Sequence, residues 1–214
     1  MAWRLPADRT RSFDLLPGTI ERLLVGGTER AALEPELLGP LGGARFDRVA
    51  FVYLDAFGWT LAQRHDDHPL RRRAATDGVV VELTSQFPST TTALTTTIHG
   101  GDPVGVHGLY EWFVYDPLVD RLIAPLLFSY AGDAERGTLT LDPADVFPAG
   151  AFYSGLAANG VRSTVVQVEA FVASPATRSQ TAGSTALVGY QGARDGVEKL
   201  AAALAEPGYG MLDL

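Results

Sequence analysis

The most constraining feature of the sequence is a continuous apolar run at residues 49–54, which follows Arg48 and ends at Asp55. The run reads Val-Ala-Phe-Val-Tyr-Leu and is rich in β-branched and aromatic residues. Continuous rather than alternating hydrophobicity indicates a strand that is buried on both faces, as in a parallel sheet covered by helices. The run therefore predicts a buried strand of a parallel sheet in an α/β protein.

Further strands and helices are expected to alternate along the chain. Strands are predicted at residues 78–83, 162–168 and 208–214, and helices at residues 61–68, 91–98, 145–159 and 192–205. This order favours an α/β three-layer sandwich with a mostly parallel sheet. Residues 1–43 are interpreted as an N-terminal helical extension and residues 44–214 as the main domain. Residues 174–189, rich in Ser, Thr and Ala, are expected to form a surface loop.

The charge balance limits the classes of partner. The chain has 17 Lys and Arg residues, 25 Asp and Glu residues and a formal net charge of −8. A protein that binds a nucleic-acid polymer normally carries a basic face, and the one basic cluster here is Arg71-Arg72-Arg73. We interpret that cluster as the solvated side of a helix or loop. No nucleic-acid polymer is expected as a partner, and positive charge for an anionic substrate would come from metal ions.

Cysteine is absent, so disulfides and thiolate metal sites are excluded. Any metal would be held by Asp, Glu, His or hydroxyl oxygens. No apolar stretch has the length of a signal-peptide core or of a membrane span. The sequence therefore predicts a cytoplasmic protein without a membrane partner, and it leaves the oligomeric state open.

Polar residues that could carry chemistry follow the first two predicted strands. Asp55 ends the first strand, and Thr90, Thr91 and Thr92 follow the second. Functional groups collect at this edge of a parallel sheet. Each of these residues by itself is more typical of an ordinary helix N-cap.

The four histidines and two of the tryptophans can also be interpreted from the sequence. His65 and His68 are interpreted as exposed polar residues at a helix end, and His99 and His107 as makers of structural hydrogen bonds. Trp59 is expected to pack in the core, whereas Trp112 is a candidate wall of a substrate pocket.

Taken together, two segments resemble a known family. The segment Val49-Ala-Phe-Val-Tyr-Leu-Asp55-Ala-Phe-Gly-Trp59 resembles the first metal-binding strand of type I phosphodiesterases and nucleotide pyrophosphatases, within the alkaline phosphatase superfamily. The run Phe87-Pro-Ser-Thr-Thr91, followed by Thr95, Gly100, Pro103 and His107-Gly108, resembles the nucleophile segment of that family. The spacing of 36 residues between Asp55 and Thr91 is also one that the family uses.

The resemblance implies an alkaline-phosphatase-like fold and a specific chemistry. It implies two divalent metal ions, zinc in the family, and a small-molecule phosphoester substrate. Thr91 would be the nucleophile and Asp55 a ligand of the ion that also contacts Thr91. Metal coordination would lower the pKa of the Thr91 hydroxyl. The N–H of Thr92, at the start of a helix, would donate to the developing oxyanion, with Trp112 beside the substrate.

The sequence also departs from the family pattern. Thr92-Ala-Leu-Thr95 replaces an aromatic–Pro–Asn–His run, and Leu109-Tyr-Glu-Trp112 stands where many members have a phosphate-binding Asn. The substrate is therefore left open. Thr90 and Thr92 stay alternatives to Thr91 as the nucleophile, although the offset from Pro88 favours Thr91.

The later metal ligands of the family are the largest departure. The family takes an Asp-x-x-x-His pair, an Asp-His dipeptide and a further His from downstream, and no His follows His107 here. Asp213 is interpreted as lying too early along its strand to serve. We therefore expect a truncated N-terminal half of a catalytic domain that is poorly active by itself. Its incomplete sheet is expected to expose an apolar edge at residues 208–214. The alternative is a non-catalytic fold remnant or binding module of the same superfamily.

Overall fold

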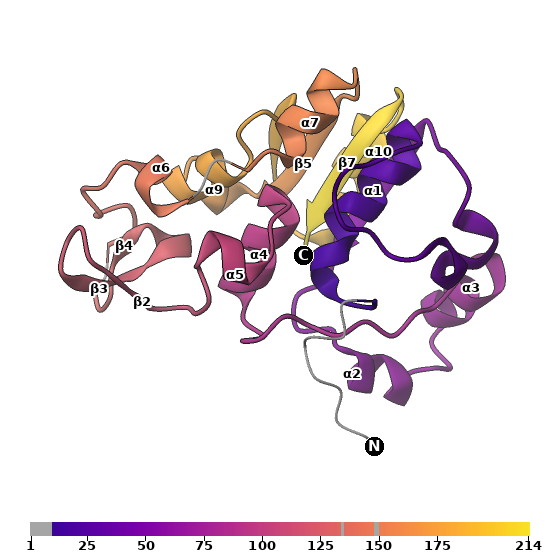
Figure 1. Ribbon diagram of the computed structural model, residues 1–214, viewed down its shortest axis with the longest axis horizontal. Coiled ribbons are helices and arrows are strands. Elements are labelled where there is room, and N and C mark those ends of the chain that lie inside the picture. The colour runs from indigo at the N-terminus through magenta and orange to yellow at the C-terminus, as the bar shows by residue number, and fades with distance from the viewer. Residues whose placement is uncertain (1–9, 134, 148–149) are drawn as a thin grey trace.

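A four-stranded parallel sheet forms the centre of the protein (Figure 1). The computed structural model describes residues 10–133, 135–147 and 150–214. The strands lie in the order β1-β7-β5-β6. Their bounds are β1 Arg48–Tyr53, β5 Ser163–Val168, β6 Ala186–Tyr190 and β7 Gly208–Asp213. All three strand pairs are parallel, as the continuous apolar pattern of β1 predicted.

Helices cover both faces of this sheet. On one face lie α1 (Leu16–Val25), α4 (Thr91–Gly100) and α7 (Phe152–Ala158), which share a buried cluster with Val165 and Met211 of the strands. On the other face α10 (Ala193–Ala203) packs on Val166 and Leu212. Neighbouring residues of β5 and β7 therefore serve opposite layers, as strand geometry requires. The predicted α/β three-layer sandwich is confirmed, and it is consistent with an alkaline-phosphatase-like fold.

Strand β7 is central, and the expectation that residues 208–214 form an exposed apolar edge is wrong. β7 pairs with β1 on one side and β5 on the other, and Met211 and Leu212 are fully buried. A Cβ on Gly210 would lie 2.6 Å from Leu200 of α10, so the small residue permits close packing of the helix. The edge strands of this sheet are instead β1 and β6. Val52 of β1 is 45 % exposed, so the prediction that this strand is buried on both faces is wrong.

Three other predicted elements differ from the structure. Residues 78–83 form no strand. Val79, Val80, Val81 and Leu83 line a cavity, and the neighbouring Thr84 makes only an isolated bridge to Ser12. The single helix predicted over 145–159 is two helices, α6 (Pro143–Val146) and α7, and Gly160 follows the second with φ 73°. Residues 174–189 are not a surface loop, since they contain α9 (Pro175–Gln180) and most of β6.

A smaller antiparallel sheet projects from the main body (Figure 1). It consists of β2 (Val114–Asp116), β3 (Arg121–Ala124) and β4 (Ser129–Tyr130), with its own buried cluster around Ile123 and Phe128. The remaining elements are η1 Phe13–Leu15, η2 Pro35–Leu41, α2 Trp59–Arg64, α3 Pro69–Asp77, α5 Val104–His107, η3 Pro125–Leu127 and α8 Glu169–Val172. Within the described ranges, no helix is both long and apolar enough to cross a membrane.

The predicted N-terminal extension contributes to the main core through α1. Ile20 and Leu24 are buried in the same cluster as Ile98 of α4. The division between residues 43 and 44 stays a prediction, and residues 1–9 lie outside the described part of the chain. Helix α1 therefore supports the helix that begins at Thr91.

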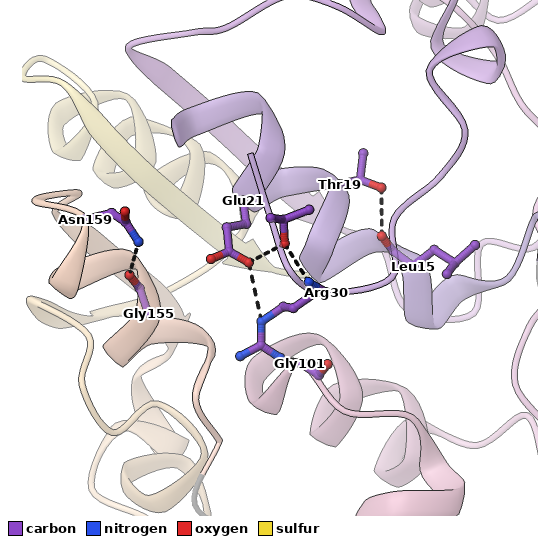
Figure 2. Close-up of polar contacts among 8 residues, drawn as sticks. Leu15, Thr19, Glu21, Arg30, Gly101, Gly155 and Asn159 are labelled. Carbon is purple, nitrogen blue, oxygen red and sulfur yellow. Dashed lines mark hydrogen bonds and ion pairs between the residues drawn. The ribbon is translucent and has the colours of Figure 1, made fainter. Parts of the chain in front are cut away.

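A polar network joins the loop after α1 to the C-terminal end of α4 (Figure 2). Thr28 Oγ1 donates to Glu21 Oε2 at 2.7 Å, and Arg30 Nε lies 3.5 Å from the same oxygen. Arg30 Nη1 also donates to the carbonyl oxygen of Gly101, the residue that ends α4, at 3.2 Å. The contacts fix α4 at the end opposite to Thr91.

Replacing Gly150 with alanine is expected to destabilise the fold by about 1–3 kcal/mol. A Cβ at this position would lie 2.5 Å from the Cα of Gly100 in α4, and backbone atoms cannot move aside as a flexible side chain can. Urea unfolding would measure the change in the free energy of unfolding. Gly105→Ala is the matched control, because an added Cβ there meets nothing within 4 Å. Equal stabilities of the two variants would contradict the close approach.

Candidate active site

Asp55 and Thr91 meet at the carboxyl edge of the sheet. The Thr91 hydroxyl donates a hydrogen bond to Asp55 Oδ2 at 3.1 Å, which confirms the predicted proximity of the two side chains. Asp55 Oδ1 accepts from the Tyr53 hydroxyl at 3.4 Å and from the Ala56 N–H at 2.9 Å. The carboxylate is exposed, and among the described residues it forms no ion pair with a basic group. The pair therefore offers two oxygen atoms to solvent at one point of the surface.

Helix α4 begins at Thr91, as the sequence predicted. Thr90 is the N-cap, and its side chain accepts from the Ala93 N–H at 3.4 Å. The helix ends at Gly100, slightly later than the predicted Ile98. Thr92 is fully buried, and its hydroxyl has no hydrogen-bond partner among the described residues. Of the three threonines, Thr91 alone places its hydroxyl on Asp55 at the positive end of the helix dipole.

Buried polar contacts anchor the body of α4. Thr97 Oγ1 accepts from Gln86 Nε2 at 2.6 Å and lies 3.1 Å from His107 Nε2. His107 Nδ1 accepts from the Leu109 N–H, so the neutral ring carries its proton on Nε2 and donates to Thr97. His99 Nδ1 lies 2.7 Å from the Tyr153 hydroxyl. The expected structural hydrogen bonds of the two histidines are confirmed.

Burial changes the protonation of both histidines. Desolvation lowers the pKa of His99 to about 4, and that of His107 also to about 4. Both rings are therefore neutral at pH 7. Neither ring lies among the residues that line the cavity at Asp55 and Thr91, so we assign both to the support of α4.

Asp213 also lies at this sheet edge, although sequence reasoning excluded it. The Asp55 N–H donates to the Leu214 carbonyl oxygen at 3.1 Å, because β1 and β7 are neighbours. Asp213 Oδ2 accepts from Gln167 Nε2 at 3.1 Å. Burial raises the pKa of Asp213, and the negative charge of Asp55 raises it further. The pairing of β7 with β1 could not be read from local patterns, so the proximity of the two carboxyl groups was missed.

A large cavity opens beside the pair. Its volume is about 1410 Å³, and Asp55, Thr91 and Trp112 are among its lining residues. The other walls come from α2, α3 and the extended segment 79–85. Trp59 also lines this cavity and is only half-buried, so its expected place in the core is wrong. It is the first residue of α2, and that end of the helix faces the cavity rather than the sheet.

His65 and His68 lie on the cavity wall and are exposed, as expected for polar residues at a helix end. His68 is the N-cap of α3, and its Nδ1 accepts from the Leu70 N–H at 3.3 Å. The His68 side chain therefore has a structural role as a helix cap.

The donors at the sheet edge suit part of a divalent metal site. Asp55 and Thr91 supply oxygen atoms, which zinc and harder cations accept. Residues 10–133, 135–147 and 150–214 contain no group of three or more His, Asp or Glu side chains that could hold a metal ion. Asp55 and Thr91 therefore fit as a partial ligand set.

Comparison with known proteins yields one match. A family model described as type I phosphodiesterase / nucleotide pyrophosphatase matches residues 49–166. This range covers more than half of the chain and contains most of β1, Asp55, the whole of α4 and the small sheet. No curated protein and no solved structure matches the chain.

Proposed function

Because the chain belongs to the type I phosphodiesterase and nucleotide pyrophosphatase family, we propose that it is a phosphoester hydrolase with Thr91 as nucleophile and Asp55 as metal ligand. The observation that carries this proposal is the 3.1 Å hydrogen bond between Thr91 Oγ1 and Asp55 Oδ2. Thr90 and Thr92 are weaker candidates, since the first caps α4 and the second is buried. The substrate is a small phosphoester.

The side chains of this site have distinct proposed roles. Asp55 accepts the Thr91 hydrogen bond and so orients the Thr91 oxygen toward the open cavity. The N–H of Thr92 and the helix dipole stabilise negative charge that develops on the phosphoryl oxygens. Trp112 is exposed on the cavity wall and would contact the leaving group. A bound divalent ion, zinc in this proposal, would supply positive charge that lowers the pKa of the hydroxyl.

Metal affinity is expected to limit activity. A catalytic zinc site normally uses three protein ligands, and Asp55 and Thr91 provide two. One of these is a neutral hydroxyl until it loses its proton. We therefore propose that the two-zinc site of this family needs Asp and His ligands in addition to those that the structure brings together here.

We expect the 214-residue chain to hydrolyse bis(4-nitrophenyl) phosphate slowly or not at all with zinc present. A protein extended past Leu214 by a segment that carries the family's Asp-x-x-x-His ligands should hydrolyse it faster. In that protein, Asp55→Asn should lower turnover by about 100-fold or more, because several kcal/mol of metal-dependent stabilisation is lost. Asp195→Asn is the control, since Asp195 lies on α10 and pairs with Lys199. Release of nitrophenolate measures all of these rates.

A non-catalytic binding module is the second candidate. It is favoured by the lack of a three-ligand group among the described residues. If the extended protein shows no zinc-dependent hydrolysis, and Asp55→Asn leaves its zinc affinity unchanged, the hydrolase proposal fails and the binding module stands. Rapid zinc-dependent turnover by the 214-residue chain itself would instead show that two recognised ligands suffice.

A further inference from the structure

The cavity contains a cation that the proposed chemistry does not use. Arg71 of α3 lies on the cavity wall and is half-buried. Its Nε is shielded from solvent and has no hydrogen-bond partner among the described residues. Its guanidinium lies 5.5 Å from the ring centroid of Trp59. The prediction that residues 71–73 form a solvated cluster is therefore wrong for Arg71.

Arg73, on the same helix, is a solvated arginine. Its side chain is exposed, and its Nε pairs with Asp77 Oδ2 at 2.9 Å, four residues later. Arg71 instead turns toward the cavity, where it is the only arginine or lysine among the lining residues that the structure describes. The two arginines therefore form a natural pair of test and control positions.

The surroundings of Arg71 suit an anion attached to a flat ring. The half-buried Arg71 guanidinium makes no hydrogen bond or ion pair with the described residues, and ligand oxygens in the cavity would supply acceptors to its exposed nitrogen atoms. The planar guanidinium matches the geometry of carboxylate and phosphoryl oxygens. Trp59 offers an aromatic surface within the same cavity, against which a second ring can pack. Because the protein carries a net charge of −8, such a local cation is needed to attract an anion.

We propose that this end of the cavity binds an aromatic oxyanion, with Arg71 contacting the charged oxygens and Trp59 packing against the ring. Asp55 and Thr91 line the same cavity, so this group would belong to the leaving side of the substrate. That placement rests on the proposed function, whereas the binding of the anion does not. The implied substrates are aryl phosphodiesters whose leaving group carries an additional carboxylate or phosphoryl group.

The test measures ligand binding without turnover. The 214-residue chain, in buffer with EDTA to remove metals, is titrated with benzoate, phenylphosphonate and the neutral benzamide by NMR. The wild-type chain should bind at least one of the two anions about tenfold or more tightly than benzamide. Whichever anion binds more tightly identifies a carboxylate or a phosphoryl group as the natural partner.

Variants locate the binding at Arg71. Arg71→Gln should reduce the affinity for the preferred anion about tenfold or more, and Arg71→Lys should retain part of it. Arg73→Gln should leave the affinity unchanged. Equal binding of benzamide and both anions by the wild-type chain would overturn the proposal, as would equal anion affinities in Arg71→Gln and Arg73→Gln. If Arg71→Gln does not fold, the wild-type comparison still decides.

The binding test is independent of the hydrolase proposal. Thr91→Ala should bind the preferred anion as the wild-type chain does, because Arg71 and Trp59 belong to α3 and α2. Absence of zinc-dependent hydrolysis in the extended protein, with intact anion binding, would therefore refute the proposed function and leave the binding site standing. Loss of the anion preference with intact hydrolysis would refute the anion site and leave the proposed function standing.

Discussion

Replacing Thr91 with alanine is expected to lower zinc-dependent phosphodiester hydrolysis by about 1000-fold or more. The variant lacks the oxygen that would attack phosphorus. It also loses metal activation of that nucleophile, which lowers the activation free energy by several kcal/mol. Thr91→Ser keeps the hydroxyl and should retain a measurable part of the activity. The rates are measured with bis(4-nitrophenyl) phosphate in the same extended protein that tests the proposed function.

The neighbouring threonines are the controls for this experiment. Thr90→Ala removes the N-cap of α4, so it should cost about 1 kcal/mol of stability with a much smaller effect on turnover. Thr92→Val should be neutral or stabilising, because the buried Thr92 hydroxyl has no partner among the described residues. If Thr90→Ala or Thr92→Val abolishes turnover while Thr91→Ala does not, the nucleophile has been misassigned.

Lowering the pH from 7 to about 4 is expected to destabilise the fold by several kcal/mol. His99 and His107 have a pKa of about 4 when folded, against about 6.5 when unfolded. Between these values the unfolded chain binds more protons than the folded chain, so stability falls as the pH falls. His99, buried against Tyr153, should account for up to about 3 kcal/mol, and the slightly less buried His107 for less.

Urea unfolding at pH 7.5 and at pH 4.5 tests this expectation. His99→Gln should lose less stability on acidification than the wild-type chain, because glutamine does not titrate. His65→Gln is the control, since His65 is exposed. The raised pKa of Asp213 acts in the opposite direction, because its folded form holds a proton more tightly. That effect is common to all the variants and cancels in the comparison. Identical pH dependence in wild type and His99→Gln would contradict the assignment.

Some features could be read from local sequence because local forces determine them. The continuous apolar run before Asp55 predicted a parallel strand, and β1 lies in a parallel sheet. The Pro-Ser-Thr-Thr pattern predicted a helix at Thr91, and the Thr90 hydroxyl caps it. The resemblance to the family could be recognised around both residues for the same reason, because each motif is short and contiguous. The closeness of Asp55 and Thr91 was predicted from the ends of two parallel strands, and it is present although residues 78–83 form no strand.

Other features depend on pairing between distant segments, and only the tertiary structure decided them. Residues 78–83 are as β-prone as β1, yet they line the cavity instead of joining the sheet. Strand β7 pairs with β1 across most of the chain length, which makes it central and brings Asp213 to Asp55. Arg71 looks like its neighbour Arg73 in sequence, but the helix turns only Arg71 toward Trp59. Sequence patterns alone therefore determined the strand before Asp55, the helix at Thr91 and the paired motif. Long-range packing determined the strand order, the position of Asp213 and the position of Arg71, because burial and register depend on residues far away along the chain.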